Sequence, residues 1–182
     1  MRKALTLALI LAAGPALATG LRIEVEGEAQ GTITIDLLED VAPGHVARIT
    51  ELARAGRYDG VWFHRVIDGF MAQTGDVQYG KVGGDMRMAG RGDSGMPDLK
   101  AEFSDIPFDR GVVGMGRKAD PDSANAQFFI MFAPGYHLNG QYTVVGRVTS
   151  GMEVVDAIKR GAGRNGEVIG APDYMATVTV TD

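Results

Sequence analysis

Residues 63–76 read FHRVIDGFMAQTGD, and the rest of the chain is best interpreted outward from this stretch. The pattern predicts two short strands joined by a turn, which places four side chains close together: Arg65, Phe70, Met71 and Gln73. Large apolar residues such as Phe70 and Met71 belong by default to a core. A cation and an amide next to apolar side chains could instead orient a peptide group, and these residues alone leave both interpretations open.

Short β-like runs recur on both sides of this stretch. Period-two alternation of apolar and polar residues predicts strands at residues 21–26, 32–37 and 174–180. Further runs lie at residues 61–64, 70–73, 112–115, 128–132 and 143–148. Strands joined mostly by turns favour an antiparallel barrel, and 26 glycines in 182 residues suit a chain with many turns.

Two helices are expected among these strands. The first starts at Pro43 and ends at Gly56, and we expect His45 to be exposed on it. The second follows residues 150–153, whose Ser-Gly-Met-Glu sequence fits a capping box, and Gly161 is its expected C-terminal cap. His64 is interpreted as a structural histidine. Residues 77–97, rich in Gly, Asp, Arg and Met, predict a long loop that is functional or mobile.

The N-terminus has the pattern of a secretory signal peptide. Two basic residues, Arg2 and Lys3, precede a short apolar run at residues 5–11, and Ala-Leu-Ala at 16–18 forms a cleavage site. The alternative, a membrane anchor, needs about 20 apolar residues, which is more than this run provides. We therefore expect residues 1–18 to be removed and residues 19–182 to form one domain.

Charge and cysteine content exclude several classes of function. Removing two basic residues with the signal leaves 16 basic against 23 acidic residues, a net charge of −7. This balance argues against nucleic-acid binding, which needs a concentrated basic face. The chain has no cysteine, so disulfides, thiol nucleophiles and cysteine-based zinc sites are impossible.

Three segments in register resemble the cyclophilin family of peptidyl-prolyl cis-trans isomerases. The first is residues 63–76, the second runs from Gly114 to Ile130, and the third is LNGQYTVVGRV at 138–148, followed by GMEVV at 151–155. The resemblance covers nearly the whole chain after residue 18. It implies a closed eight-stranded antiparallel β-barrel capped by two α-helices, a mainly β fold that matches the strands and helices expected above.

The resemblance also implies roles for particular residues. Arg65 matches the catalytic arginine, and Gln73 matches the glutamine that contacts substrate and helps to place it. The expected walls of the proline pocket are Phe70, Met71, Phe129 and Leu138. The backbone at Arg117 corresponds to a position that hydrogen-bonds the peptide, and Gln127 belongs to the same groove. The reaction needs no cofactor and no metal, and the implied partners are proline-containing polypeptides.

Three groove positions depart from the family's pattern. His137 stands where many eukaryotic members have a tryptophan that contacts the inhibitor cyclosporin. Tyr142 stands where many have a histidine, and Gly116 replaces a common alanine. The expected catalytic residues are unaffected, so these differences bear on inhibitor affinity and substrate preference.

Three other functions fit the sequence less well than isomerisation. A chaperone that only holds proline-containing segments would not need a cation at Arg65. A Ser-His-Asp hydrolase or a metal site could draw on three histidines, but the chain has no G-x-S-x-G elbow around Ser94 or elsewhere and no H-x-x-x-H pair. We expect a monomer in the periplasm, free of the membrane after signal removal, with secretion as the alternative.

Overall fold

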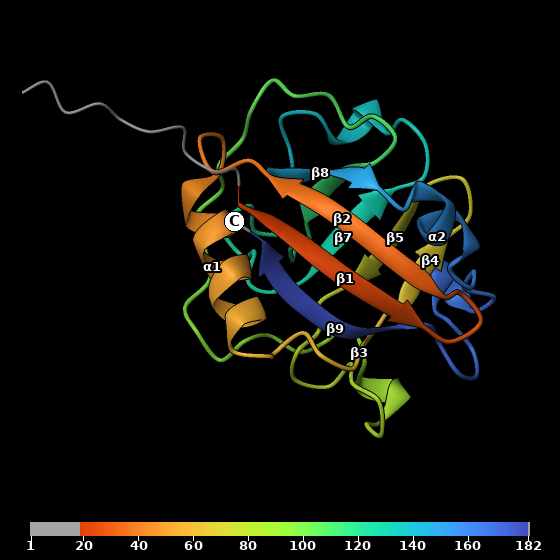
Figure 1. The fold of residues 1–182 in the computed structure, drawn as a ribbon. Helices are drawn as coiled ribbons and strands as arrows, with labels where there is room; N and C mark the ends of the chain where they lie inside the picture. Colours follow the sequence, from red (N-terminus) through yellow and green to blue (C-terminus); the bar gives the residue numbers. More distant parts are fainter. Residues whose placement is uncertain (1–18, 182) are drawn as a thin grey trace, which may run out of the picture.

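The computed structural model describes residues 19–181 as a mainly β fold with two α-helices (Figure 1). The strands are β1 (Gly20–Glu26), β2 (Gly31–Leu37), β3 (Val61–Trp62), β4 (Arg65–Ile67), β5 (Met71–Thr74), β6 (Val112–Met115), β7 (Phe128–Met131), β8 (Val144–Ser150) and β9 (Tyr174–Thr181). The helices are α1 (Pro43–Arg54) and α2 (Met152–Ala157), with 3₁₀-helices η1 (Met86–Met88), η2 (Tyr136–Leu138) and η3 (Arg164–Gly166). The predicted signal peptide lies outside the described residues. Within residues 19–181, no helix has both the length and the apolar character needed to span a membrane.

The strands form one curled antiparallel sheet, and the prediction of a closed eight-stranded barrel is wrong. Nine strands pair in the order β3-β9-β1-β2-β8-β6-β7-β5-β4, and the edge strands β3 and β4 do not pair with each other. The extra strand arises because the chain turns a corner at Phe63 and His64, which separate β3 from β4. Neighbouring loops satisfy the backbone there: the Phe63 N–H donates to the Asp173 carbonyl, and the Val168 N–H donates to the His64 carbonyl.

The inside of the curled sheet holds the main core. Alternate residues of β1 and β2 are buried there as predicted: Leu21, Ile23, Val25, Ile33, Ile35 and Leu37. Helix α1 adds Val46, Ile49 and Leu52 to the same cluster, and Figure 1 shows α1 and α2 at opposite ends of the curled sheet. Adjacent strand residues point to opposite faces, so Met71 lies outside where Ala72 lies inside. Met71 accordingly belongs to a second, smaller cluster with Phe108, Val112, Phe129, Met131, Leu138 and Val144.

Helix α1 begins at Pro43 as predicted, but its N-terminus is capped by a residue that is distant in the sequence. Its N-cap residue, Ala42, offers no side-chain acceptor, and the Glu102 carboxylate accepts hydrogen bonds from the Gly44 and His45 N–H groups instead. The expectation that His45 is exposed is wrong: the residue is fully buried, with its Nδ1 2.6 Å from Glu102 Oε2. The ring is thus in contact with a carboxylate from a distant part of the chain.

Helix α2 differs from its prediction at both ends. No side chain caps it, because the N-cap residue is Gly151 in the left-handed conformation, at φ 86°. Only glycine fits there, since a Cβ at this position would lie 2.1 Å from the Thr32 carbonyl oxygen. The helix ends at Ala157, ahead of the expected cap at Gly161.

Candidate active site

Strand pairing gathers the residues of the 63–76 segment on the outer face of the sheet. Arg65 on β4 lies opposite Gln73 on β5, and Gln73 lies opposite Phe129 on β7. Phe129 in turn lies opposite Gly114 on β6, so one row of residues crosses four strands. A Cβ at Gly114 would lie 2.5 Å from the Phe129 ring, so the glycine lets this ring settle close to the sheet.

A groove of about 370 Å³ opens over this row. Its lining residues are Arg65, Phe70, Met71, Gln73, Gly116, Arg117, Phe129, His137, Leu138, Gln141 and Tyr142. Every predicted site residue except Gln127 is among them. Gln127 lines an adjoining hollow of about 200 Å³, which shares Gln73, Gly116 and Arg117 with the groove.

The walls of the groove are mostly aromatic and apolar. The Phe70 ring lies 5.4 Å from the His137 ring, centroid to centroid. Phe129 meets Tyr142 edge-on at 5.9 Å and stacks with Phe108 at 5.8 Å on its other side. These contacts hold the aromatic rings in fixed positions along the groove.

Arg65 supplies the cation at the rim of the groove. Its Nη1 donates to Gln73 Oε1 at 3.0 Å, and its Nε donates to the Asn165 carbonyl oxygen at 2.9 Å. Partial burial lowers the pKa of Arg65 from its ordinary value, with Tyr142 opposing the shift. A guanidinium nevertheless stays protonated at neutral pH, so the site holds a fixed, oriented donor.

Arg117 and Gln141 support the wall of the groove that contains Tyr142 and His137. Gln141 was not among the site residues predicted from the sequence. The Arg117 guanidinium lies 4.3 Å from the centre of the Tyr142 ring and donates to the carbonyl oxygens of Lys118, Ala119 and Gln141. Gln141 Nε2 donates to the His137 carbonyl oxygen at 2.9 Å. The Arg117 side chain is therefore engaged with the protein itself. Gln141 could have been suspected only from its place between Leu138 and Tyr142.

The groove has aromatic and apolar walls on one side, the guanidinium of Arg65 at its rim, and no serine, threonine or cysteine among its lining residues, which suits a planar amide that carries an apolar ring. The model of the family described as "Cyclophilin type peptidyl-prolyl cis-trans isomerase/CLD" matches residues 21–180. The chain belongs to this cyclophilin family. Its activity is therefore the cis-trans isomerisation of X–Pro peptide bonds.

Curated relatives agree with this assignment. A protein from Brucella suis, named "Probable peptidyl-prolyl cis-trans isomerase", is 54% identical over 152 residues, which cover 82% of this chain and 78% of the relative. "Peptidyl-prolyl cis-trans isomerase B" of Bacillus subtilis is 39% identical over 131 residues, which cover 71% of this chain and 84% of that one.

Solved structures share the fold. A cyclophilin-type isomerase from Cryptosporidium parvum superposes with a TM-score of 0.75 at 22% identity, covering 91% of this chain and 99% of that one. A cyclophilin from Hirschia baltica superposes with a TM-score of 0.70 at 24% identity, covering 88% and 73% of the two chains. At these identities the likeness concerns the fold.

Proposed function

We propose that Arg65 is the catalytic residue of this isomerase and that its substrates are folding or exported proteins. The observation that supports this most is the placement of the Arg65 guanidinium, which Gln73 and the Asn165 carbonyl hold at the rim of the groove, beside its apolar walls. A proline ring fits between Phe70, Met71, Phe129 and Leu138, which leaves its amide nitrogen next to the guanidinium.

Arg65 would act on the twisted state of the peptide bond. Rotation about an X–Pro bond is slow because the nitrogen shares its lone pair with the carbonyl, which gives a barrier of about 18–20 kcal/mol. Twisting returns the lone pair to the nitrogen. A donor aimed at the nitrogen therefore binds the twisted state more strongly than either planar state, and this difference lowers the barrier.

Arg65 supplies only part of the effect. A barrier of about 20 kcal/mol corresponds to a rate of roughly 0.01 per second, and lowering it by about 8 kcal/mol gives a rate on the order of 10⁴ per second. One hydrogen bond from a charged donor contributes about 1.5–3 kcal/mol. The remainder is assigned to fixed dipoles in the partly dry groove and to the grip on the proline ring while the preceding carbonyl turns.

The direct test is turnover of a short X-Pro-Phe peptide by residues 19–182. We expect the rate of cis-to-trans conversion to be well above the uncatalysed rate. The conversion is monitored with a protease that cleaves only the trans form. If the folded protein leaves the rate of conversion at its uncatalysed value, the proposal is wrong.

We further propose that the protein is exported, to the periplasm or alternatively to the medium, and that it acts there as a monomer. The support is the signal pattern at residues 1–18, with small residues at Ala16 and Ala18. Protein recovered outside the cytoplasm should begin at Thr19, and bulky residues at 16 and 18 should block cleavage. Mass spectrometry that finds Met1 on exported protein would refute this proposal, and gel filtration tests the monomer.

A further inference from the structure

A buried carboxylate fixes the long loop at residues 77–97. Asp76 is fully buried, and its Oδ1 accepts hydrogen bonds from the N–H groups of Gln78 and Tyr79, at 3.1 and 2.9 Å. Its Oδ2 accepts from the N–H groups of Gly90 and Gly92, at 2.7 and 3.0 Å. Four backbone donors compensate the buried charge, and the carboxylate ties the two ends of the segment 78–92 to one point.

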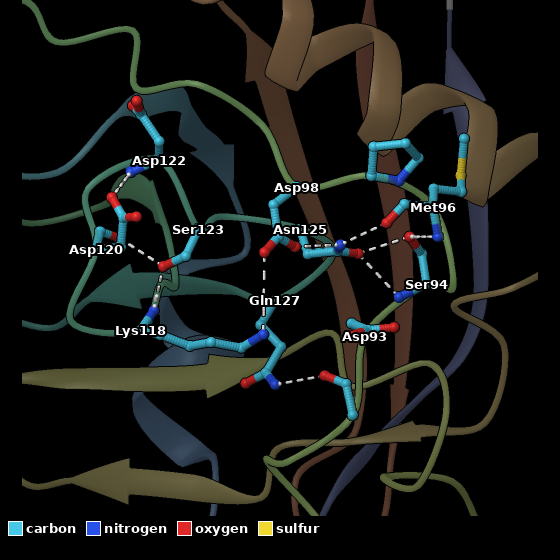
Figure 2. Close-up of polar contacts among 12 residues, drawn as sticks. Asp93, Ser94, Met96, Asp98, Lys118, Asp120, Asp122, Ser123, Asn125 and Gln127 are labelled. Atoms are coloured by element: carbon cyan, nitrogen blue, oxygen red, sulfur yellow. Dashed lines mark hydrogen bonds and ion pairs between the residues drawn. The ribbon is translucent and has the colours of Figure 1, made fainter.

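The next part of the loop is held separately, by Asn125. Figure 2 shows the Asn125 amide between Ser94 and Asp98: Oδ1 accepts from the Ser94 N–H and hydroxyl, while Nδ2 donates to the Met96 carbonyl and to Asp98. Asp76 and Asn125 together anchor the loop on both sides of residue 92. Gly90 and Gly92 are thereby held in the lining of the hollow that adjoins the groove.

These two carbonyls begin a chain of side-chain hydrogen bonds that ends at Arg65. Gln127 Nε2 donates to the carbonyl oxygens of Gly90 and Gly92, at 3.1 and 3.0 Å, and Figure 2 shows its amide directed at the loop. Gln73 Nε2 then donates to Gln127 Oε1 at 2.9 Å. Arg65 Nη1 donates to Gln73 Oε1 at 3.0 Å.

Only one orientation of the two amides satisfies this chain. Backbone carbonyls can only accept, and a guanidinium can only donate. The carbonyls of Gly90 and Gly92 therefore require the NH₂ of Gln127 to face the loop. Its oxygen then faces Gln73, and the oxygen of Gln73 faces Arg65. Without the carbonyls, Gln127 loses the acceptors that keep its oxygen directed at Gln73, and a flipped Gln127 would place its NH₂ against the NH₂ of Gln73.

We infer that Asp76 is a positioning residue for the isomerase reaction. It acts through the carbonyls of Gly90 and Gly92 and the amides of Gln127 and Gln73 on the orientation of Arg65. The inference rests on the proposed role of Arg65 as the catalytic donor. It also gives the 77–97 loop a function, since this loop supplies the two acceptors that fix the end of the chain opposite Arg65.

The test compares Asp76→Ala with Asp173→Ala. Asp173 is also a buried carboxylate, 1% exposed, that accepts backbone N–H bonds, from Glu28, Ala29 and Lys159, none of which lines the groove. Both variants should lose stability. Only Asp76→Ala should lose about tenfold in kcat, with KM within about twofold, because a misplaced donor weakens transition-state binding. Asp76→Asn, which keeps one acceptor oxygen, should recover part of the loss.

A second readout follows Arg65 itself. The Nε–H signal of Arg65 in a ¹H–¹⁵N spectrum should move in Asp76→Ala and stay in place in Asp173→Ala. If wild type shows no turnover, the proposed function fails, while this signal still tests the chain of contacts. Equal kcat and an unmoved Arg65 signal in both variants would overturn the inference.

A further variant tests the inference even if Asp76→Ala does not fold. Gln127→Glu keeps an acceptor for Gln73 but cannot donate to the loop carbonyls. It should show the same loss of kcat and the same movement of the Arg65 signal. Unchanged kcat in folded Gln127→Glu would also overturn the inference.

Discussion

Two neighbouring rows of residues cross the same four strands, β4, β5, β7 and β6, on opposite faces. The inner row, each member at most 1% exposed, is Val66, Ala72, Ile130 and Val113. The outer row, offset by one residue along each strand, is Arg65, Gln73, Phe129 and Gly114. The inner row is entirely apolar, whereas the outer row carries a cation and an amide beside an aromatic ring. Stability and chemistry are thus assigned to opposite faces of one set of strands, and single substitutions should separate them.

Substitutions of the adjacent residues Phe128 and Phe129 should separate effects on stability from effects on activity most clearly. Phe128 is 1% exposed on the inner face and meets Tyr58 edge-on at 5.6 Å. Phe128→Ala should lower the free energy of unfolding by about 3–5 kcal/mol, because it leaves a cavity in the core, with little change in kcat/KM per folded molecule. Denaturant unfolding and a turnover assay measure the two effects.

Phe129→Ala is the partner of that experiment. It also destabilises the protein, but it removes a wall of the groove, so kcat/KM per folded molecule should fall by about tenfold or more. Equal kcat/KM in the two folded variants would break the assignment of chemistry to the outer face.

Arg65 should matter to activity with little effect on stability. Arg65→Ala should lower kcat/KM by about 10²–10³, by analogy with the loss of a preorganised donor. Arg65→Lys should recover only part of this, since lysine lacks the planar fork of donors. Steady-state kinetics measure the activity of the two variants, and thermal unfolding measures their stability. Near-full activity in folded Arg65→Ala would show that Arg65 has no part in the mechanism.

His64, at the corner between the two edge strands, should make stability depend on pH. Burial lowers its pKa from 6.5 to about 4, with the nearby Asp76 opposing the shift. As the pH falls from about 6.5 to about 4, the unfolded chain binds a proton that the folded protein does not. The free energy of unfolding should therefore fall by up to about 1.4 kcal/mol per pH unit in this range.

Urea unfolding at several pH values measures that slope, and His64→Gln is its control. The variant has no titrating ring at this position, so its stability should depend less on pH between about 6.5 and 5. The same slope in wild type and His64→Gln would show that other groups cause it.

Position 137 should affect inhibitor binding more than turnover. Histidine is smaller than the tryptophan found in many eukaryotic cyclophilins and lacks its indole N–H, so we predict weak cyclosporin binding with normal activity. His137→Trp should tighten cyclosporin binding by about tenfold or more, roughly 1.4 kcal/mol, and change peptide turnover far less. Calorimetry tests this, and tight binding by the unmodified protein would contradict it.

The sequence predicted the elements whose signals are local. Period-two alternation located β1 and β2, and Pro43 marked the start of α1. The resemblance placed Arg65, Gln73 and their neighbours around one groove, because the segments that carry it are also the strands that build the groove.

Features that depend on distant contacts were not predictable. The capping box at residues 150–153 failed because the close approach of Thr32 requires Gly151 as the N-cap. The buried His45 is paired with Glu102, 57 residues away. The split into β3 and β4 depends on loops that meet the corner at His64. None of these leaves a periodic signal in the sequence.

The most direct test of the account is the exchange of a bound X-Pro-Phe peptide between its cis and trans forms, observed by NMR at saturating peptide. Wild-type protein should bind the peptide and give cis–trans exchange cross-peaks, whereas Arg65→Ala should keep the binding shifts and lose most of the exchange. Full exchange in Arg65→Ala, or binding without exchange in the wild type, would contradict the claim that the outer face of the sheet is a catalytic site built around Arg65.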